Sequence, residues 1–180
     1  MKYPKFTVII PQKNRAEYIK HTLKTCMIQE YPNFEIIVSD DCSDDNSVEV
    51  IEDLMKKDDR IRLFAHEKHL GMRDNFEFAL NQVQSGYVIA LGGDDGLVPG
   101  CIWRMYEILQ ETKAKLLTWR PAGYLYSEQT DVPALMLIPR VKNRGVKWIK
   151  SEDFLNKMAS TLWYLSDDCP MIYMKGVASL

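Results

Sequence analysis

The sequence predicts an α/β fold with a mostly parallel central sheet and helices on both of its faces. Short apolar segments, typical of strands buried on both sides, alternate with longer segments that carry apolar residues at helical spacing. Connections long enough to hold a helix join parallel strands through right-handed crossovers. The chain of 180 residues is also long enough for one domain with a substantial core.

The first two predicted strands each lead into a segment with a helix-start pattern. We expect a strand at residues 6–10, ended by Pro11, and a second strand at residues 34–38. In a capping box, a polar residue at the helix start is paired with a glutamate three residues later. Two such pairs mark the expected helix starts, and they are Asn14 with Glu17 and Asn46 with Glu49.

Three further strands and two further helices complete the predicted sheet. Residues 61–65 are the third strand, residues 87–91 the fourth and residues 116–119 the fifth. A helix follows Pro99, because proline is tolerated at the first helical position. Another helix follows Gly71, and its buried face is predicted to carry Met72, Phe76, Ala79, Leu80 and Val83.

The pattern is weaker after Arg120. We expect short strands at residues 124–126 and 171–174 and a helix that Ser151 caps. A mild excess of basic residues between positions 120 and 150 suits either a solvated loop or a basic rim for an anionic substrate. We therefore divide the chain into an α/β unit at residues 1–119 and a second region at residues 120–180.

Composition excludes several classes of protein. The chain is 46% hydrophobic and 27% charged with a formal net charge of −2, which gives no basic surplus for a nucleic-acid partner. The apolar runs are shorter than the roughly 20 residues that span a bilayer, and no secretory signal opens the chain. Its four cysteines have no metal-ligand spacing. We expect a cytoplasmic protein, and leave open self-association and peripheral attachment at the inner face of the membrane.

Polar clusters follow three of the predicted strands. They are residues 11–15, the pair Asp40 and Asp41, and the pair Asp94 and Asp95 behind the glycines of a tight turn. The carboxyl ends of parallel strands bind ligands in open α/β sheets. Two adjacent carboxylates repel each other unless a cation is supplied, and a divalent ion that also touches substrate phosphates is the usual solution. The alternative is an acidic turn in water.

Two blocks of sequence carry a family resemblance. FTVIIPQKNRAEYIKHTLKTCMIQEYPNFEIIVSDDCSDDNS resembles the opening of the family 2 glycosyltransferases of the GT-A fold, which move a sugar from a nucleoside diphosphate donor. HLGMRDNFEFALNQVQSGYVIALGGDDGLVP resembles the next block of that family, which ends in its aspartate-rich metal motif. The resemblance covers residues 4–112. It implies an inverting, metal-dependent enzyme of surface-glycan synthesis that uses Mn²⁺ or Mg²⁺ and a nucleotide-sugar, most commonly a UDP-sugar.

The resemblance also implies roles for individual residues. Asp95 is expected to bind the cation, and Asp94 to contact the ribose of the donor or share the metal. Asp41 is expected to accept a hydrogen bond from the base, with charge compensation at a helix start as the alternative. The other expected nucleotide-binding residues are Pro11, Asn14, which also suits a plain helix cap, Arg15 and Arg73, which also suits a surface position.

Three departures limit what the resemblance implies. Lys13 stands where the family has an aromatic residue, and Cys42 where glycine is common. The family's catalytic carboxylate is expected beyond Leu180, so the acceptor-side portion is expected to be missing or incomplete. Asp167 and Asp168 are weak candidates for the base. The three histidines (His21, His66 and His69) are predicted to lie on the surface without a partner carboxylate.

Two other functions compete with glycosyl transfer. A nucleotidyltransferase has a related fold and an aspartate metal site, but it would need a glycine-bearing loop after the first strand, and residues 11–18 contain no glycine. A non-catalytic module that binds a nucleotide or a partner protein is the other alternative, because the base is not found.

Overall fold

The computed structural model describes residues 3–118, 123–125, 135–137, 150, 152–153 and 176–179. The chain divides into two compact units, residues 1–117 with 176–180, and residues 118–175. In the second unit, strands β6 (Gly123–Leu125) and β7 (Leu135–Leu137) pair antiparallel. The strand predicted at residues 171–174 lies outside the described residues, as does most of the helix predicted after Ser151.

The first unit is built on a six-stranded sheet with the order β3-β2-β1-β4-β8-β5. The first four strands are parallel neighbours, and β8 runs antiparallel to β4. Their bounds are β1 (Phe6–Gln12), β2 (Phe34–Asp40), β3 (Ile61–Ala65), β4 (Tyr87–Ala90), β5 (Leu116–Thr118) and β8 (Gly176–Ser179).

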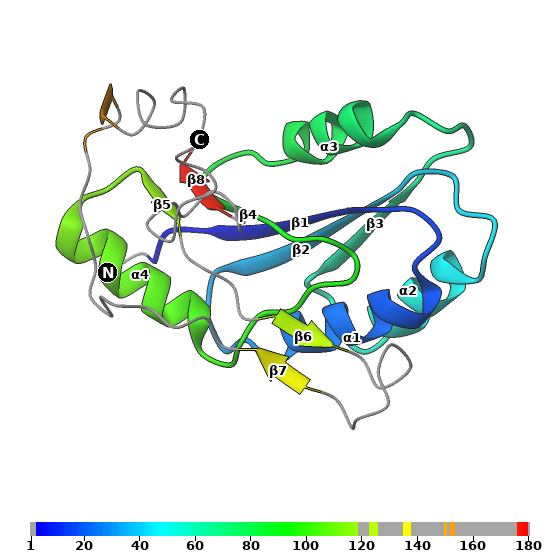
Figure 1. Cartoon of the computed structure of the whole chain (residues 1–180), viewed down its shortest axis with the longest axis horizontal. Coiled ribbons are helices and arrows are strands. Elements are labelled where there is room, and N and C mark those ends of the chain that lie inside the picture. Colours follow the sequence, from blue (N-terminus) through cyan, green and yellow to red (C-terminus); the bar gives the residue numbers. More distant parts are fainter. Residues whose placement is uncertain are drawn as a thin grey trace. The chain divides into compact units, whose positions relative to one another are not determined.

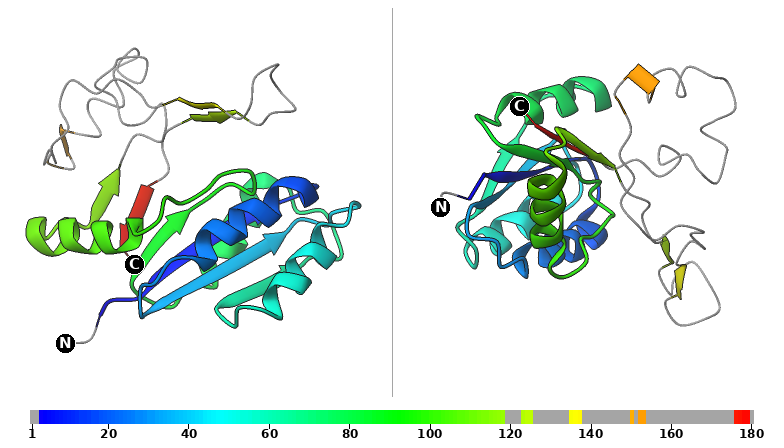
Figure 2. Two further views of the ribbon diagram at one scale, coloured as in Figure 1. Left: turned by 90° about the horizontal axis from the view of Figure 1, so that it is seen from below. Right: turned by 90° about the vertical axis from the view of Figure 1, so that its left-hand side faces the viewer.

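Helices cover both faces of this sheet, as Figures 1 and 2 show. Helix α3 (Met72–Asn81), which connects β3 to β4, lies on one face. Helices α1 (Ala16–Met27), α2 (Ser47–Met55) and α4 (Cys101–Thr112) lie on the other. The predicted doubly covered α/β architecture is therefore confirmed.

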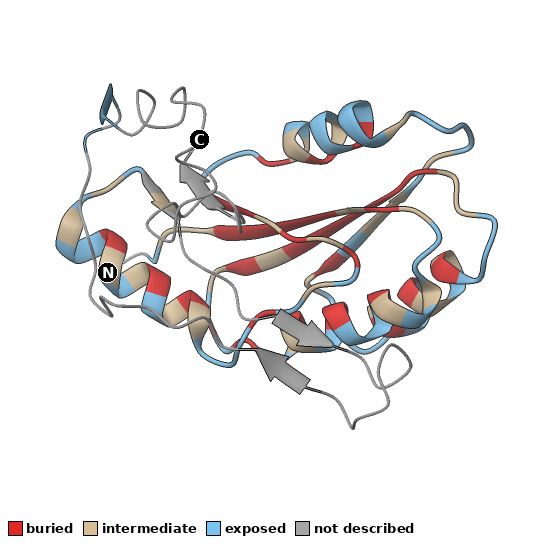
Figure 3. Cartoon of the chain, in the orientation of Figure 1, coloured by how far each residue is buried: buried red, intermediate tan, exposed pale blue. Residues whose placement is uncertain are grey.

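The core is centred on β1 and β2. Figure 3 shows both strands buried along most of their length. Between the sheet and α3, Ile9, Ile37, Ala79, Val83 and Val88 form a buried cluster. Burying one aliphatic side chain of this kind contributes about 1.5 to 3 kcal/mol. This packing gives the strand ends a rigid support.

The predicted buried face of α3 is partly wrong. Ala79 and Val83 are buried, but Met72 is 84% exposed and Phe76 is 38% exposed. Asn75 faces the sheet instead, because its Nδ2 donates to the carbonyl oxygen of Ser39 (3.0 Å) and its Oδ1 accepts from the Ser39 hydroxyl (2.6 Å). Adjacent helical residues are about 100° apart around the axis, so this contact turns Phe76 outward.

Strand β1 does not end at Pro11, as predicted, but continues to Gln12. The carbonyl oxygen of Ile9 accepts from the N–H of Leu91, so alternate residues of β1 point their backbone groups toward β4. Pro11 has the same orientation as Ile9, and β4 ends at Ala90, before it reaches Pro11. The N–H that proline lacks therefore has no strand partner to lose.

Both predicted capping boxes are wrong. Asn14 precedes the N-cap residue of α1, which is Arg15, and neither Arg15 nor Asn46 makes a side-chain cap bond. Asp45 caps both helix starts, since its Oδ2 accepts from the N–H of Ala16 (3.0 Å) and its Oδ1 from the N–H of Ser47 (2.9 Å). A residue from one loop thus replaces two local caps.

Candidate functional site

The order of the strands places the candidate site between β1 and β4. The chain runs outward from β1 through β2 to β3, and then returns to the other side of β1 as β4. Loops that follow the two strands at such a reversal separate from each other, and open α/β sheets bind ligands there. The polar segments after β1, β2 and β4 all lie at this carboxyl edge of the sheet.

Hydrogen bonds join the loop after β1 to the loop after β2. Lys13 Nζ donates to the carbonyl oxygens of Asp41 (3.0 Å) and Cys42 (2.5 Å). Four further bonds continue this row, and they are Asn14 N to Ser43 Oγ (2.9 Å), Arg15 N to Ser47 Oγ (3.0 Å), Ala16 N to Asp45 Oδ2 (3.0 Å) and Asp44 N to Asn14 Oδ1 (2.9 Å). The two loops are thus fixed to each other before any ligand arrives.

Asp40 stabilises these two loops through hydrogen bonds to its carboxylate. Its carboxylate accepts a hydrogen bond from the buried Gln12 Nε2 and two more from Ser43, through the backbone N–H (2.9 Å) and the hydroxyl (2.5 Å). Gln12 Oε1 is buried without a hydrogen-bond partner. Asp40 therefore has a structural role.

Asp41 is held by the segment that leads into α3. Its Oδ1 accepts from the N–H of Leu70 (2.5 Å) and its Oδ2 from the N–H of Gly71 (3.0 Å), and His69 Nδ1 lies 2.9 Å from Oδ2. The prediction that His69 lacks a partner carboxylate is wrong. The Asp41 side chain is only 5% exposed, whereas His69 is 61% exposed. The carboxylate thus binds backbone N–H groups of the two residues that precede α3.

The turn after β4 carries Asp94 and Asp95. It closes on itself through Asp95 N to Gly92 O and Gly92 N to Asp95 Oδ2, both at 3.1 Å. The hydroxyl of Thr22, on α1, donates to the carbonyl oxygen of Gly93 (3.0 Å). A Cβ atom on Gly93 would lie 2.9 Å from the Cβ of Gln12, so glycine allows the turn to approach the end of β1.

Arg15 and Asp94 connect the loops after β1 and β4. Their side chains approach to 3.8 Å between Arg15 Nε and Asp94 Oδ2, and each is about half exposed, at 48% and 52%. A pair this exposed adds little stability. Both groups therefore remain available to a ligand.

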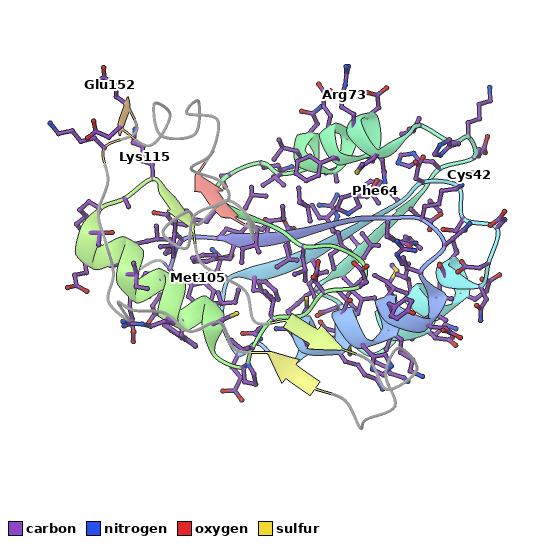
Figure 4. All side chains as sticks on the ribbon, in the orientation of Figure 1. Cys42, Phe64, Arg73, Met105, Lys115 and Glu152 are labelled. Carbon is purple, nitrogen blue, oxygen red and sulfur yellow. The ribbon has the colours of Figure 1, made fainter. Side chains whose placement is uncertain are left out.

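The remaining predicted site residues are Pro11, Arg73, Asp167 and Asp168. Pro11 lies in β1 beside Ser39 of β2, at the carboxyl edge. Arg73 points away from the sheet (Figure 4), is 90% exposed and pairs with Asp74, its neighbour in the chain. Figure 4 also shows Cys42 at the opposite end of the sheet from Met105. Asp167 and Asp168 lie outside the described residues.

The model of the family described as Glycosyl transferase family 2 matches residues 7–167, most of the chain. The chain belongs to glycosyltransferase family 2. Similar curated proteins include the GalNAc(5)-diNAcBac-PP-undecaprenol beta-1,3-glucosyltransferase of Campylobacter jejuni, 36% identical over 60% of this chain and 35% of that protein. The putative teichuronic acid biosynthesis glycosyltransferase TuaG of Bacillus subtilis is 31% identical over 72% of this chain and 50% of its own length. This chain thus spans half or less of these two relatives.

Solved structures share the fold of this chain. TarS from S. aureus, solved also in complex with UDP-GlcNAc, aligns with a TM-score of 0.62 and 24% identity over 80% of this chain and 37% of that chain. The mannosyltransferase PcManGT from Pyrobaculum calidifontis, in complex with GDP-Man and Mn²⁺, aligns with a TM-score of 0.60 and 19% identity over 66% of this chain and 36% of its own. The first unit therefore has the predicted GT-A fold.

The side chains of the turn after β4 fit a cation that the substrate helps to hold. Within the described ranges, no three side chains of His, Cys, Asp and Glu group closely enough to hold a metal ion alone. Mg²⁺ and similar ions are often bound by one or two carboxylates together with substrate phosphates and water. Asp94 and Asp95 match that donor set.

Several residues that shape the site were not predicted from the sequence. Thr22 and Asp45 were not assigned to it, and Gln12 and Lys13 were included only as members of the polar cluster at residues 11–15, without a role. Thr22 could have been recognised from the sequence, because it is a polar residue on the buried face of α1, which also carries Ile19, Leu23 and Cys26. The partners of the others come from distant parts of the chain.

No helix in the described part of the protein is both long and apolar enough to cross a membrane.

Proposed function

We propose that this protein takes part in metal-dependent, inverting transfer of a sugar from a UDP-sugar to a glycan acceptor. One observation carries the proposal: the Asp94–Asp95 turn packs against the end of β1, beside loops that already hold Lys13, Arg15 and Asp41. Base, ribose and diphosphate groups would thus meet at one edge of the sheet. TarS, solved with UDP-GlcNAc, and PcManGT, solved with GDP-Man and Mn²⁺, have the same fold.

The donor would be held from both sides of β1. Asp41 would accept the N–H of the base, since Oδ1 and Oδ2 each receive one backbone hydrogen bond and a carboxylate can accept about four. Asn14 and Arg15 would lie toward the ribose and phosphates, with Pro11 beneath the base. Arg73 could reach the diphosphate only if its contact with Asp74 were broken.

Asp95 and Asp94 would hold Mn²⁺ or Mg²⁺. Such an ion supplies positive charge that stabilises the diphosphate leaving group. Asp95 is already oriented by the N–H of Gly92, which keeps one carboxylate oxygen facing its own turn. Asp94 carries no such backbone bond among the described contacts, so it would be free to turn between Arg15 and the ion or ribose.

The acceptor hydroxyl would form a bond to the anomeric carbon as the bond to the diphosphate breaks. Its proton must pass to a base, a contribution of typically 10²- to 10⁴-fold. Asp167 and Asp168 are the candidates within this sequence. A glycan acceptor is supported by the Campylobacter relative, a GalNAc(5)-diNAcBac-PP-undecaprenol glucosyltransferase, and by the Bacillus relative, assigned to teichuronic acid biosynthesis.

Calorimetry with UDP tests the donor side. We expect binding in MnCl₂ and a loss of at least tenfold in affinity when EDTA replaces the metal. Asp95→Asn should lose the metal dependence, because it removes one negative charge from the turn. Asp59→Asn, an exposed aspartate away from the site, is the matched control and should bind as the wild type does.

Equal UDP affinity with Mn²⁺ and with EDTA would rule out the cation. Absence of UDP binding under both conditions would rule out the nucleotide. If Asp95→Asn retained the metal effect, Asp94 or another residue would be the ligand of the ion.

A further inference from the structure

We propose that Lys13 is a specificity-determining residue that donates a hydrogen bond to a carbonyl oxygen of the nucleobase. Together with Asp41 it would select a base whose ring N–H lies next to a C=O, as in uracil. The inference rests on the proposed function, in which a nucleoside diphosphate binds at the carboxyl ends of β1 and β2.

The position of the ammonium group is set by the backbone. Lys13 directly follows the last residue of β1 and is half-buried. Cys42 has a left-handed backbone conformation (φ 59), which turns the chain just after β2. In this turn the carbonyl oxygens of Asp41 and Cys42 both accept from Lys13 Nζ, at 3.0 and 2.5 Å. A flexible side chain is thereby held in one place.

One donor of the ammonium group remains for a ligand. An ammonium has three N–H donors and no acceptor. The two carbonyl contacts account for two of these donors. Because the group bonds the carbonyl oxygen of Asp41 itself, the third N–H lies next to the residue whose carboxylate is proposed to accept from the base.

Lys13 and Asp41 form a donor and acceptor pair that fits one kind of base edge. Uracil presents its N3–H between two carbonyl oxygens, whereas cytosine presents an unprotonated N3 beside an amino group. A carboxylate only accepts and an ammonium only donates, so uracil matches both groups. The N3 and amino group of cytosine would face an acceptor and a donor of the wrong kind, which rejects it.

Other basic side chains near the site are less suited to this role. Arg15 lies toward Asp94, on the side of the β4 turn. Arg73 is directed to solvent and bonded to Asp74. His69 lies against the Asp41 carboxylate, with Nδ1 2.9 Å from Oδ2, and therefore faces the acceptor of the pair.

The test compares UDP and CDP, which share ribose and diphosphate and differ only at the base edge. Binding is measured by calorimetry in MnCl₂ for the wild type, Lys13→Met, Lys13→Arg and the control Lys20→Met, an exposed lysine of α1. We expect the wild type and Lys20→Met to prefer UDP by tenfold or more. Lys13→Met should weaken UDP by about tenfold and bring the UDP-to-CDP ratio toward one. Lys13→Arg should retain the preference.

The ratio separates recognition from loop support. If Lys13 only fixes the two loops, Lys13→Met will weaken both nucleotides equally and leave the ratio unchanged, which would overturn the inference. If Lys13→Met does not fold, Lys13→Leu gives the same test, because it also has no donor for the base. Failure of the wild type to bind UDP would instead overturn the proposed function and this inference with it.

Discussion

Arg60 joins two parts of the first unit through one guanidinium group. Its Nη atoms donate to the carbonyl oxygens of Gln29 (2.7 Å) and Met27 (2.6 Å) at the end of α1. Its Nε and one Nη bond the carboxylate of Asp58 (2.9 and 2.7 Å). These bonds from Arg60 hold the pKa of Asp58 below its usual range, despite the opposing effect of burial. Arg60 thus connects the end of α1 to the turn before β3.

We predict that Arg60→Met lowers the free energy of unfolding by about 1.5 to 3 kcal/mol at pH 7, because two helix carbonyls and a carboxylate lose a charged donor. The control is Arg62→Met, since Arg62 stacks on an aromatic ring as Arg60 does but makes only a 3.7 Å ion pair with Glu35. It should change stability by less than about 1 kcal/mol. Urea denaturation measures both, and equal losses would contradict the prediction.

The ion pair between Arg60 and Asp58 also predicts that the stability depends on pH. A lowered pKa in the folded state gives stability that is present above the unfolded pKa of about 3.9 and lost as the pH falls through the folded value. The difference between wild type and Arg60→Met should therefore shrink below about pH 4.

At the scale of elements, the start of α1 is completed by the loop after β2. Asp45 accepts from the N–H of Ala16 and from Ser47, through its N–H and its hydroxyl. Slight burial raises the pKa of this carboxyl, but the hydrogen bonds from Ser47 and Ala16 outweigh it and leave the pKa below its ordinary value. Asp45 thus acts as an N-cap that comes from another element.

We predict that Asp45→Ala costs about 0.5 to 1 kcal/mol of stability at pH 7, the low end for a lost cap because the side chain is exposed. Asp44→Ala is the control, since Asp44 is equally exposed and its N–H, rather than its carboxylate, makes the described bond. The loss should disappear as the pH falls through the lowered pKa of Asp45. Chemical denaturation at pH 7 and at low pH checks both points, and equal effects of the two substitutions would argue against the cap.

At the scale of the whole first unit, the proposed site uses the ends of β1, β2 and β4, which are the buried centre of the sheet. A ligand bound to all three strands binds only the folded protein. We predict that UDP with Mn²⁺ at about 100 times its dissociation constant stabilises the fold by about 2.7 kcal/mol and raises the Tm by about 5 to 10 °C. Differential scanning fluorimetry measures the shift, and EDTA should abolish it. Calorimetric binding without any Tm shift would place the ligand on a segment that unfolds separately.

The sequence by itself determined the order of strands and helices, the GT-A fold and the edge of the sheet that carries Asp41, Asp94 and Asp95. Apolar periodicity is a local property, so buried strands and helices can be read from neighbouring residues. Once the strands are known to be parallel, their carboxyl ends must meet at one edge. The family motifs added expected roles to residues at that edge.

Only the tertiary structure decided which side chains meet there. Asp40 and Asp41 are adjacent and chemically identical, yet one is bonded to Gln12 and Ser43 and the other to the backbone before α3. Asn75 turned α3 through its bonds with Ser39, which reversed the predicted exposure of Phe76. Except for the local bond between Asp40 and Ser43, each of these contacts joins residues far apart in the chain. Hydrogen-bond partners are set by the packing of the sheet and helices, which no local sequence pattern contains.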